Sequence, residues 1–170
     1  MWIGAIRLTV KTSDEAFAGT DSLVQATVMR DGNSLRVLSL DYLTEDDLER
    51  GAIRNYDYSG PTKLPRSNDQ TPSLPPGIGQ SPMPYPGYGF EYSNGLSGHL
   101  VIQLSIHDDD MWIKDNVDLY VKHIRQVATS FDTLAWRQDD DWTYVSSWTQ
   151  DVAMSTDSSE GVTTWNLILN

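Results

Sequence analysis

The chain has 170 residues, of which 39% are hydrophobic and 10% aromatic, and it carries a net charge of −12 with no cysteine. A chain of this length and hydrophobicity folds around a sizeable core. The acidic balance argues against nucleic acid as a partner, and against binding an anionic bilayer through basic patches, because both are polyanions. The lack of cysteine excludes disulfides, thiolate metal sites and a cysteine nucleophile.

The N-terminal residues 1–8 are apolar, but the run is too short for a signal peptide and lacks a basic start. No segment approaches the roughly 18 apolar residues that a transmembrane helix requires. We therefore expect a soluble protein without a signal peptide or a membrane-spanning segment.

Alternating apolar and polar residues predict short strands in the N-terminal part of the chain. These strands cover residues 6–11, 24–29, 35–40 and 53–58. Asp31-Gly32 is a hairpin turn signal between the second and the third, and Asn33-Ser34 lengthens that turn. In the acidic segment that follows, Thr44 and Gly51 predict a single helical turn.

The composition changes between residues 59 and 98, which hold all the prolines with many glycines and serines. Such a stretch is neither a central strand nor a long helix, and it is too long for an ordinary connection. We interpret it as a loop inserted into a single domain that covers residues 1–170. Its tyrosine-rich end, with Tyr85 and Tyr88, forms either a contact surface or a cover over one edge of the sheet.

Two further strands are predicted at residues 100–106 and 117–121, and the acidic stretch His107–Asn116 joins them at one end of a sheet. Asp108, Asp109 and Asp110 are consecutive, so their carboxylates repel one another. Solvent and salt offset that repulsion in one interpretation. A hard cation such as calcium, which takes six to eight oxygen ligands, offsets it in the other.

The extended C-terminal segment 123–170 is less clearly patterned. Residues 123–131 fit either a helix or a continued strand, and three tryptophans, at positions 136, 142 and 148, lie in a polar stretch. Residues 165–169 alternate again and predict a closing strand. Many short strands with almost no amphipathic helix indicate an all-β fold, an antiparallel β-sandwich.

Several motifs are similar to those of one family. Ala18-Gly19-Thr20-Asp21, directly after the first strand, resembles a loop of the PLAT (LH2) domain, which accompanies lipoxygenases, animal lipases, polycystins and the clostridial α-toxin phospholipase. Further matches follow in the same order: Asp46–Gly51 (with Leu48 where Phe is usual), Asn55-Tyr56, Leu100–Asp110, and Trp112 with Asn116-Val117. The resemblance covers about residues 4–58 and 98–122.

The chain departs from the family pattern in three places. The 59–98 insertion and the tail are longer than usual, and Phe17 stands where calcium-binding members often have an acidic residue. The difference at Phe17 concerns the first of the calcium sites found in members of that family.

The resemblance implies an eight-stranded β-sandwich of C2-like architecture, with calcium sites in the loops at one end. It also implies contact with a lipid or membrane surface, or with a protein partner. Carried over residue by residue, the implied metal ligands are Gly19, Thr20, Asp21, Asp41, Asp46, Asp47, Asp110 and Met111. Trp112 and Leu48 are candidates for apolar surface contacts near the metal, although Trp112 also fits a core position.

Catalytic signatures are weak. His99, His107 and His123 lack the spacing of a zinc site, and no Gly-x-Ser-x-Gly elbow or phosphate-binding glycine loop occurs. We therefore expect a non-catalytic module that binds calcium and a lipid surface. A protein-interaction domain that uses the Pro/Tyr-rich insertion, with calcium structural or absent, is the alternative. An accessory domain of a hydrolase or toxin is a third hypothesis, by analogy of fold. The pattern does not predict an oligomeric state.

Overall fold

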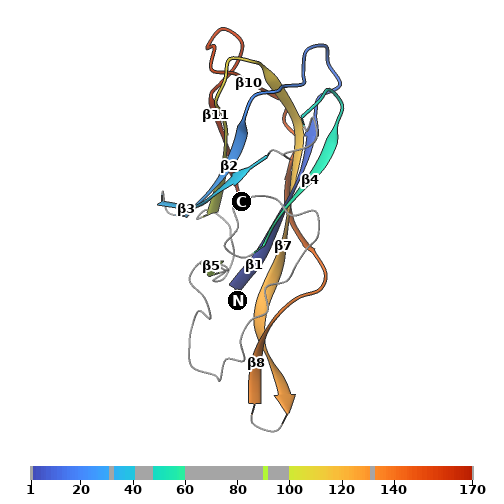
Figure 1. Ribbon diagram of the computed structural model, residues 1–170, viewed down its shortest axis with the longest axis vertical. Helices are drawn as coiled ribbons and strands as arrows, with labels where there is room; N and C mark the ends of the chain where they lie inside the picture. The colour runs from blue at the N-terminus through green and yellow to red at the C-terminus, as the bar shows by residue number, and fades with distance from the viewer. Residues whose placement is uncertain are drawn as a thin grey trace.

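The structure is a computed structural model that describes residues 2–30, 33–40, 48–59, 90–91, 100–130 and 133–169. Within these ranges all regular structure is strand, arranged in two antiparallel sheets (Figure 1). No helix in the described part of the chain is long and apolar enough to cross a membrane. The predicted all-β sandwich is confirmed.

The larger sheet has seven strands, with β10, β7, β1 and β4 side by side in that order, β8 and β9 also paired with β7, and β5 paired with β1. Its strands are β1 (Trp2–Thr12), β4 (Ile53–Ser59), β5 (Phe90–Glu91), β7 (Trp112–Ser130), β8 (Thr133–Gln138), β9 (Thr143–Trp148) and β10 (Val152–Met154). The smaller sheet has four strands in the order β11, β6, β2, β3. Its strands are β2 (Val24–Arg30), β3 (Asn33–Ser39), β6 (Leu100–Ile106) and β11 (Thr164–Ile168).

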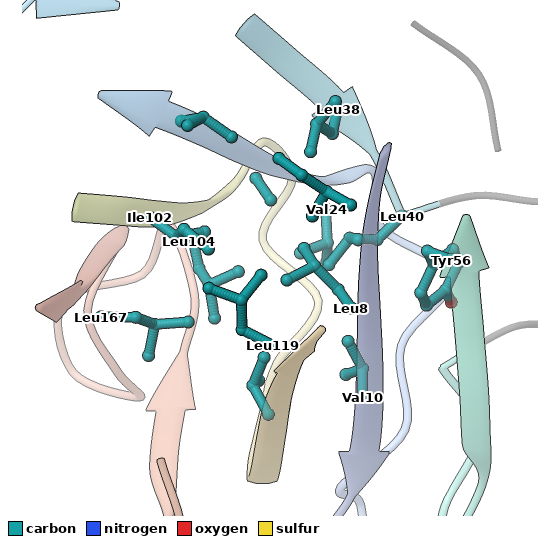
Figure 2. Packing of buried hydrophobic residues seen from close by; sticks show 14 of the residues in the cluster. Leu8, Val10, Val24, Leu38, Leu40, Tyr56, Ile102, Leu104, Leu119 and Leu167 are labelled. Atoms are coloured by element: carbon teal, nitrogen blue, oxygen red, sulfur yellow. The ribbon is translucent and has the colours of Figure 1, made fainter. Parts of the chain in front are cut away.

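The core lies between the two sheets and follows from the period-two alternation of the strands. Leu8 on β1 is in register with Tyr56 on β4 and Leu119 on β7, and all three are buried. Ile102, Leu104, Leu38 and Leu167 meet them from the smaller sheet (Figure 2). Each buried aliphatic side chain contributes about 1.5–3 kcal/mol relative to exposure, so the core is the main source of stability.

Most of the expected strands are confirmed. Residues 123–130 of the ambiguous segment continue β7, and residue 131 lies outside the described residues. The prediction that Asn33-Ser34 lengthens the Asp31-Gly32 turn is wrong, because Asn33 already pairs with Arg30 in the β2–β3 ladder. The prediction that the acidic stretch 107–116 is a loop joining two strands at one end of a sheet also needs correction. Residues 112–116 already belong to β7, and the loop itself is limited to residues 107–111. It connects β6 of the smaller sheet with β7 of the larger sheet, so it crosses between the layers at the end of the sandwich.

The C-terminal segment holds three strands that the sequence did not indicate, β8, β9 and β10. The described residues therefore contain eleven strands, which exceeds the eight that the family resemblance implies. β9 shows why the pattern was missed. Its residues are exposed or half-buried throughout, so no alternation of apolar and polar side chains marks it. Pairing with β7 places it in the sheet, and Val145 and Trp148 pack against the core while staying half-buried.

Candidate metal centre at the loop end

Four loops meet at one end of the sandwich, at the top of Figure 1, and we call this region the loop end. The loops are residues 13–23, 48–52, 107–111 and 155–163. Backbone hydrogen bonds join them. Examples are Ile113 N to Ala18 O at 3.0 Å and His107 N to Leu23 O at 3.1 Å. The loop end is therefore one connected structure, although its parts come from distant sections of the chain.

The Ala-Gly-Thr-Asp loop packs tightly on the turn before β4. A Cβ atom on Gly19 would lie 2.8 Å from the backbone nitrogen of Arg50, closer than real Cβ contacts come, so only glycine fits there. The Thr20 amide donates a hydrogen bond to the Leu48 carbonyl at 3.2 Å. This packing fixes the backbone that leads directly into Asp21.

Trp112 and Leu48 lie inside the protein and not on its surface. The exposed fraction of Trp112 is 0% and that of Leu48 is 3%. The Trp112 indole donates a hydrogen bond to the Thr12 hydroxyl at 3.1 Å, and that hydroxyl donates to the Leu48 carbonyl at 3.3 Å. The expected surface contact is therefore wrong for both residues, and the core interpretation of Trp112 is confirmed. The buried indole anchors the first residue of β7, directly after the acidic loop.

Asp21 and Asp110 come together although they are 89 positions apart. The Asp21 backbone amide donates a hydrogen bond to Oδ2 of Asp110 at 3.1 Å. Both residues are exposed, as are Asp108 and Asp109. Among the described residues, none of these four carboxylates forms an ion pair with a lysine, arginine or histidine. The two acidic loops thus meet without a countercharge from the part of the chain that the structure describes.

Other oxygen atoms near this contact fit a hard cation in kind. The Ser22 hydroxyl, next to Asp21, is buried and has no hydrogen-bond partner among the described residues. A buried polar atom without a partner is uncommon and calls for an unseen water or ion. The Thr20 hydroxyl accepts a hydrogen bond from the Ser22 amide at 3.0 Å. Carboxylate, hydroxyl and carbonyl oxygens are the donor types that calcium prefers.

The remaining predicted ligands are placed only in part. Gly19 and Met111 are half-buried members of the two loops that Asp21 and Asp110 join. Asp41, Asp46 and Asp47 lie outside the described residues, as do Tyr85 and Tyr88 of the insertion. Within the described ranges, no three acidic or histidine side chains gather closely enough to hold a metal. The full ligand set therefore stays a prediction.

The β10–β11 loop adds a fourth part that sequence reasoning missed. The Ser155 hydroxyl donates to the Asp109 carbonyl at 3.1 Å and accepts from the Asp157 amide at 3.0 Å. Hydrogen bonds from the Ser159 amide and hydroxyl lower the pKa of Asp157 below its usual value. The short Asp-Ser-Ser spacing was the available signal, since such residues often hydrogen-bond their own backbone in turns.

Phe17 is the second residue that sequence reasoning did not assign to the site. Its side chain is 86% exposed, and its φ of 64° lies in the left-handed region, which is rare for a bulky residue. An apolar aromatic residue in an otherwise polar loop was the signal. Phe17 directly precedes the buried Ala18, in a turn closed by the hydrogen bond from the Ala18 amide to the Glu15 carbonyl at 3.3 Å. A single exposed hydrophobic side chain is common, so it is the strained backbone that makes Phe17 a candidate for contact with a partner.

A second polar cluster lies on the outer face of the larger sheet. Arg7 forms a bidentate ion pair with Asp57, and its guanidinium lies 4.5 Å from the centre of the Trp142 ring. The ammonium of Lys122 lies 5.0 Å from the same ring. Trp142 is thus covered by two cations, which ties the β9 end of the sheet to β1 and β7.

Comparison with known proteins shows only a weak likeness in structure. No family model matches the chain, and no curated protein matches it. Among solved structures, the chain is similar to coral 8R-lipoxygenase, whose structure is described as showing calcium activation via a C2-like domain. The identity is 15% and the TM-score 0.43, with 89% of this chain and 16% of the lipoxygenase chain covered. The chain thus spans about one sixth of that protein. Membership of the PLAT family stays a prediction.

Proposed function

We propose that this chain is a non-catalytic module that binds calcium at the loop end and thereby attaches to a lipid surface. The contact between the Asp21 amide and the Asp110 carboxylate carries the proposal, because it brings together two acidic loops that have no countercharge among the described residues. A divalent cation offsets that repulsion and draws on the oxygen atoms nearby.

Asp21 and Asp110 would supply carboxylates, Gly19 and Met111 backbone carbonyls, and Thr20 a hydroxyl. The orphan hydroxyl of Ser22 adds a further candidate oxygen beside Asp21. Asp41, Asp46 and Asp47 would complete the six to eight ligands that calcium takes. When bound, the ion makes the local field at the loop tips less negative.

Charge explains why calcium would control attachment. A protein of net charge −12 is repelled by an anionic lipid surface. The repulsion from distant groups is screened over about 8 Å at physiological salt, so the charge at the contacting loops matters most. Calcium at the loop end replaces this electrostatic repulsion with attraction at the place where the protein meets the lipid.

Phe17 would provide the apolar part of the contact. Its side chain is 86% exposed in the free protein, so insertion among acyl chains gains about 1.5–3 kcal/mol. This energy corresponds to a roughly 10- to 100-fold change in partitioning. The residue that departs from the family pattern would thus act at the lipid and not at the metal.

The test is co-sedimentation with phosphatidylserine vesicles, in excess calcium and in excess chelator. We expect binding only with calcium, and loss of binding in Asp110→Asn. Asp140→Asn removes the same charge from an exposed turn beside β9 and should bind normally. Phe17→Ser should weaken binding at least about tenfold. Ile168→Ser is its control, because Ile168 is 48% exposed and pairs with Val101, at the end of β6 away from the loop end.

Equal sedimentation in calcium and in chelator would refute the proposal. A loss of binding in both Phe17→Ser and Ile168→Ser would refute the assigned role of Phe17, because general stickiness would then explain the effect.

A further inference from the structure

The last part of β7 leaves the sandwich together with β8. Residues Ile124–Ser130 of β7 pair with Thr133–Gln138 of β8 as a two-stranded ribbon, which projects at the bottom of Figure 1. We call this ribbon the arm. β1 accompanies β7 only as far as the pair Trp2–Ile124. Beyond that pair, neither outer edge of the arm is joined to another of the described strands.

A ribbon of two strands is at best marginally stable in water, and independent stability needs a third strand or a packed face. Exposed edges are usually protected by lysine, proline or inward-pointing charges. The arm lacks these protective residues over most of its length. Between Gln126 and Trp136 the only charged residue is Asp132, and there is neither proline nor glycine. An uncharged open edge of this kind is a template for another strand.

The register distributes apolar residues over both faces of the arm. Trp136 is opposite Gln126, and Leu134 is opposite Ala128, so these four positions share one face. Val127 and Ala135 are opposite each other on the other face. Neither face of the arm therefore carries a row of charged residues, as a face in contact with water usually does.

Charge limits which surfaces two copies of the chain can bring together. Each copy has a net charge of −12, so most contacts between copies are repulsive. Apart from Arg125 and Arg137 at its base, the paired strands of the arm are uncharged, and the arm lies at the opposite end of the long axis from the acidic loop end (Figure 1). β7 connects the two ends and has 19 residues, which is roughly 60 Å of extended strand. Contact through the arms keeps the acidic loops of both copies far apart.

We propose that the arm is a self-association element whose occupant is the arm of a second copy. The two β7 edges pair antiparallel about a twofold axis near Ala128 and form a four-stranded sheet in the order β8, β7, β7, β8. Arg125 and Arg137 face each other at the base of the arm, and beyond them β7 offers the longer uncharged edge, residues 126–130 against residues 133–136 of β8. The contact is isologous and therefore closes as a dimer. It does not depend on the calcium or lipid function.

Cysteine cross-linking tests the geometry directly, because the chain has no cysteine of its own. Residues opposite each other in an antiparallel pair have Cα atoms about 4.5–5.5 Å apart, within the range of a disulfide. We expect Ala128→Cys to form a disulfide-linked dimer under mild oxidation. Ser158→Cys places a thiol on the exposed β10–β11 loop and should stay mostly monomeric. Equal cross-linking of the two variants would overturn the proposal.

Sedimentation equilibrium of the full chain tests the affinity. We expect a species of twice the 19.1 kDa chain mass, whose dissociation constant falls between about 0.05 and about 0.5 M salt, as screening weakens the repulsion between copies. Ala128→Glu places two like charges at the axis and should raise the dissociation constant at least about tenfold. Gln150→Glu makes the same charge change in an exposed loop and should not.

Circular dichroism and thermal melting identify any variant that fails to fold. For such a case, a chain in which a two-residue Asn-Gly turn replaces residues 126–136 serves instead, and it should be monomeric. A chain that stays monomeric at every salt concentration would overturn the proposal. So would a dimer that weakens with salt, or one that survives Ala128→Glu.

Discussion

Lys114 lies near the start of β7 with no solvent-exposed surface. Its ammonium donates hydrogen bonds to the backbone carbonyls of Asp115 at 3.1 Å and Trp148 at 3.0 Å. Burial lowers the pKa of Lys114 to about 8, and the charges of Asp115 and Asp151 oppose that shift only in part. The side chain thus joins β7 to the end of β9 at the cost of burying a cation.

The buried lysine predicts a rise in stability at alkaline pH. The unfolded chain keeps the Lys114 proton up to a pKa near 10.5, whereas the folded chain loses it near 8. Between these values the unfolded state binds more protons, so the free energy of unfolding increases with pH, by up to roughly 3 kcal/mol from this group. Urea unfolding at pH values of about 7.5 and about 10 should show that the free energy of unfolding rises less in Lys114→Met than in the wild type. An identical change in the two proteins would contradict the assignment.

At the scale of elements, the C-terminal strands complete the loop end. β10 pairs with the first residues of β7 through Val152–Lys114, Ala153–Ile113 and Met154–Trp112. This pairing places the buried Ser155 against the acidic β6–β7 loop. A Cβ atom on Gly161 would lie 2.6 Å from the Ala153 carbonyl oxygen, so the returning chain also depends on glycine. The tail is thus part of the candidate site and not an appendage.

Ser155→Ala should loosen this junction. The substitution removes the hydrogen bond to the Asp109 carbonyl and leaves the Asp157 amide without its partner, so we expect a loss of about 1–2 kcal/mol in the free energy of unfolding. Hydrogen exchange should become faster at Asp157 and in the 107–111 loop. Ser158→Ala is the matched control, because Ser158 is exposed in the same loop. Equal effects of the two substitutions would show that Ser155 does not join the loops.

At the scale of the molecule, β7 separates two functions that we propose for opposite ends. It begins at the acidic loop end with the buried Trp112 and ends in the arm. A lipid surface that touches the loop end leaves the arms free to pair (Figure 1). A dimer of this geometry would present two loop ends, so its avidity depends on whether both reach one surface.

Calcium should stabilise the whole molecule if it binds only the folded state. At a calcium concentration about a hundredfold above the dissociation constant, the gain is roughly 2.7 kcal/mol. For a chain of this size, that gain raises the melting temperature by roughly 5–10 °C. Thermal unfolding in excess calcium and in excess chelator measures the shift. Asp110→Asn should abolish it, and Asp140→Asn should keep it. No shift in the unmodified protein would mean that the acidic loops are simply solvated.

The candidate site was predictable where the motif is contiguous. The Ala18–Asp21 loop and the acidic run at Asp108–Asp110 are local patterns, and both lie at the loop end. The exposure of Phe17 was not predictable, because an aromatic residue beside a polar loop fits either environment, whereas the core position of Trp112 was one of the two interpretations that its place before a strand allowed. Ser155 was missed because Asp109, the partner through which it joins the acidic loop, lies 46 positions away along the chain.

The amino-acid sequence by itself determined the all-β class and most of the inward-facing residues, such as Leu8, Val28 and Leu104, because period-two alternation is a local property of a half-buried strand. Only the tertiary structure decided which strands are neighbours. It joined Asp21 to Asp110, paired the polar β9 with β7, and left the arm outside the sandwich. Alternation records that one face of a strand is buried, but pairing depends on how the entire chain closes around its core.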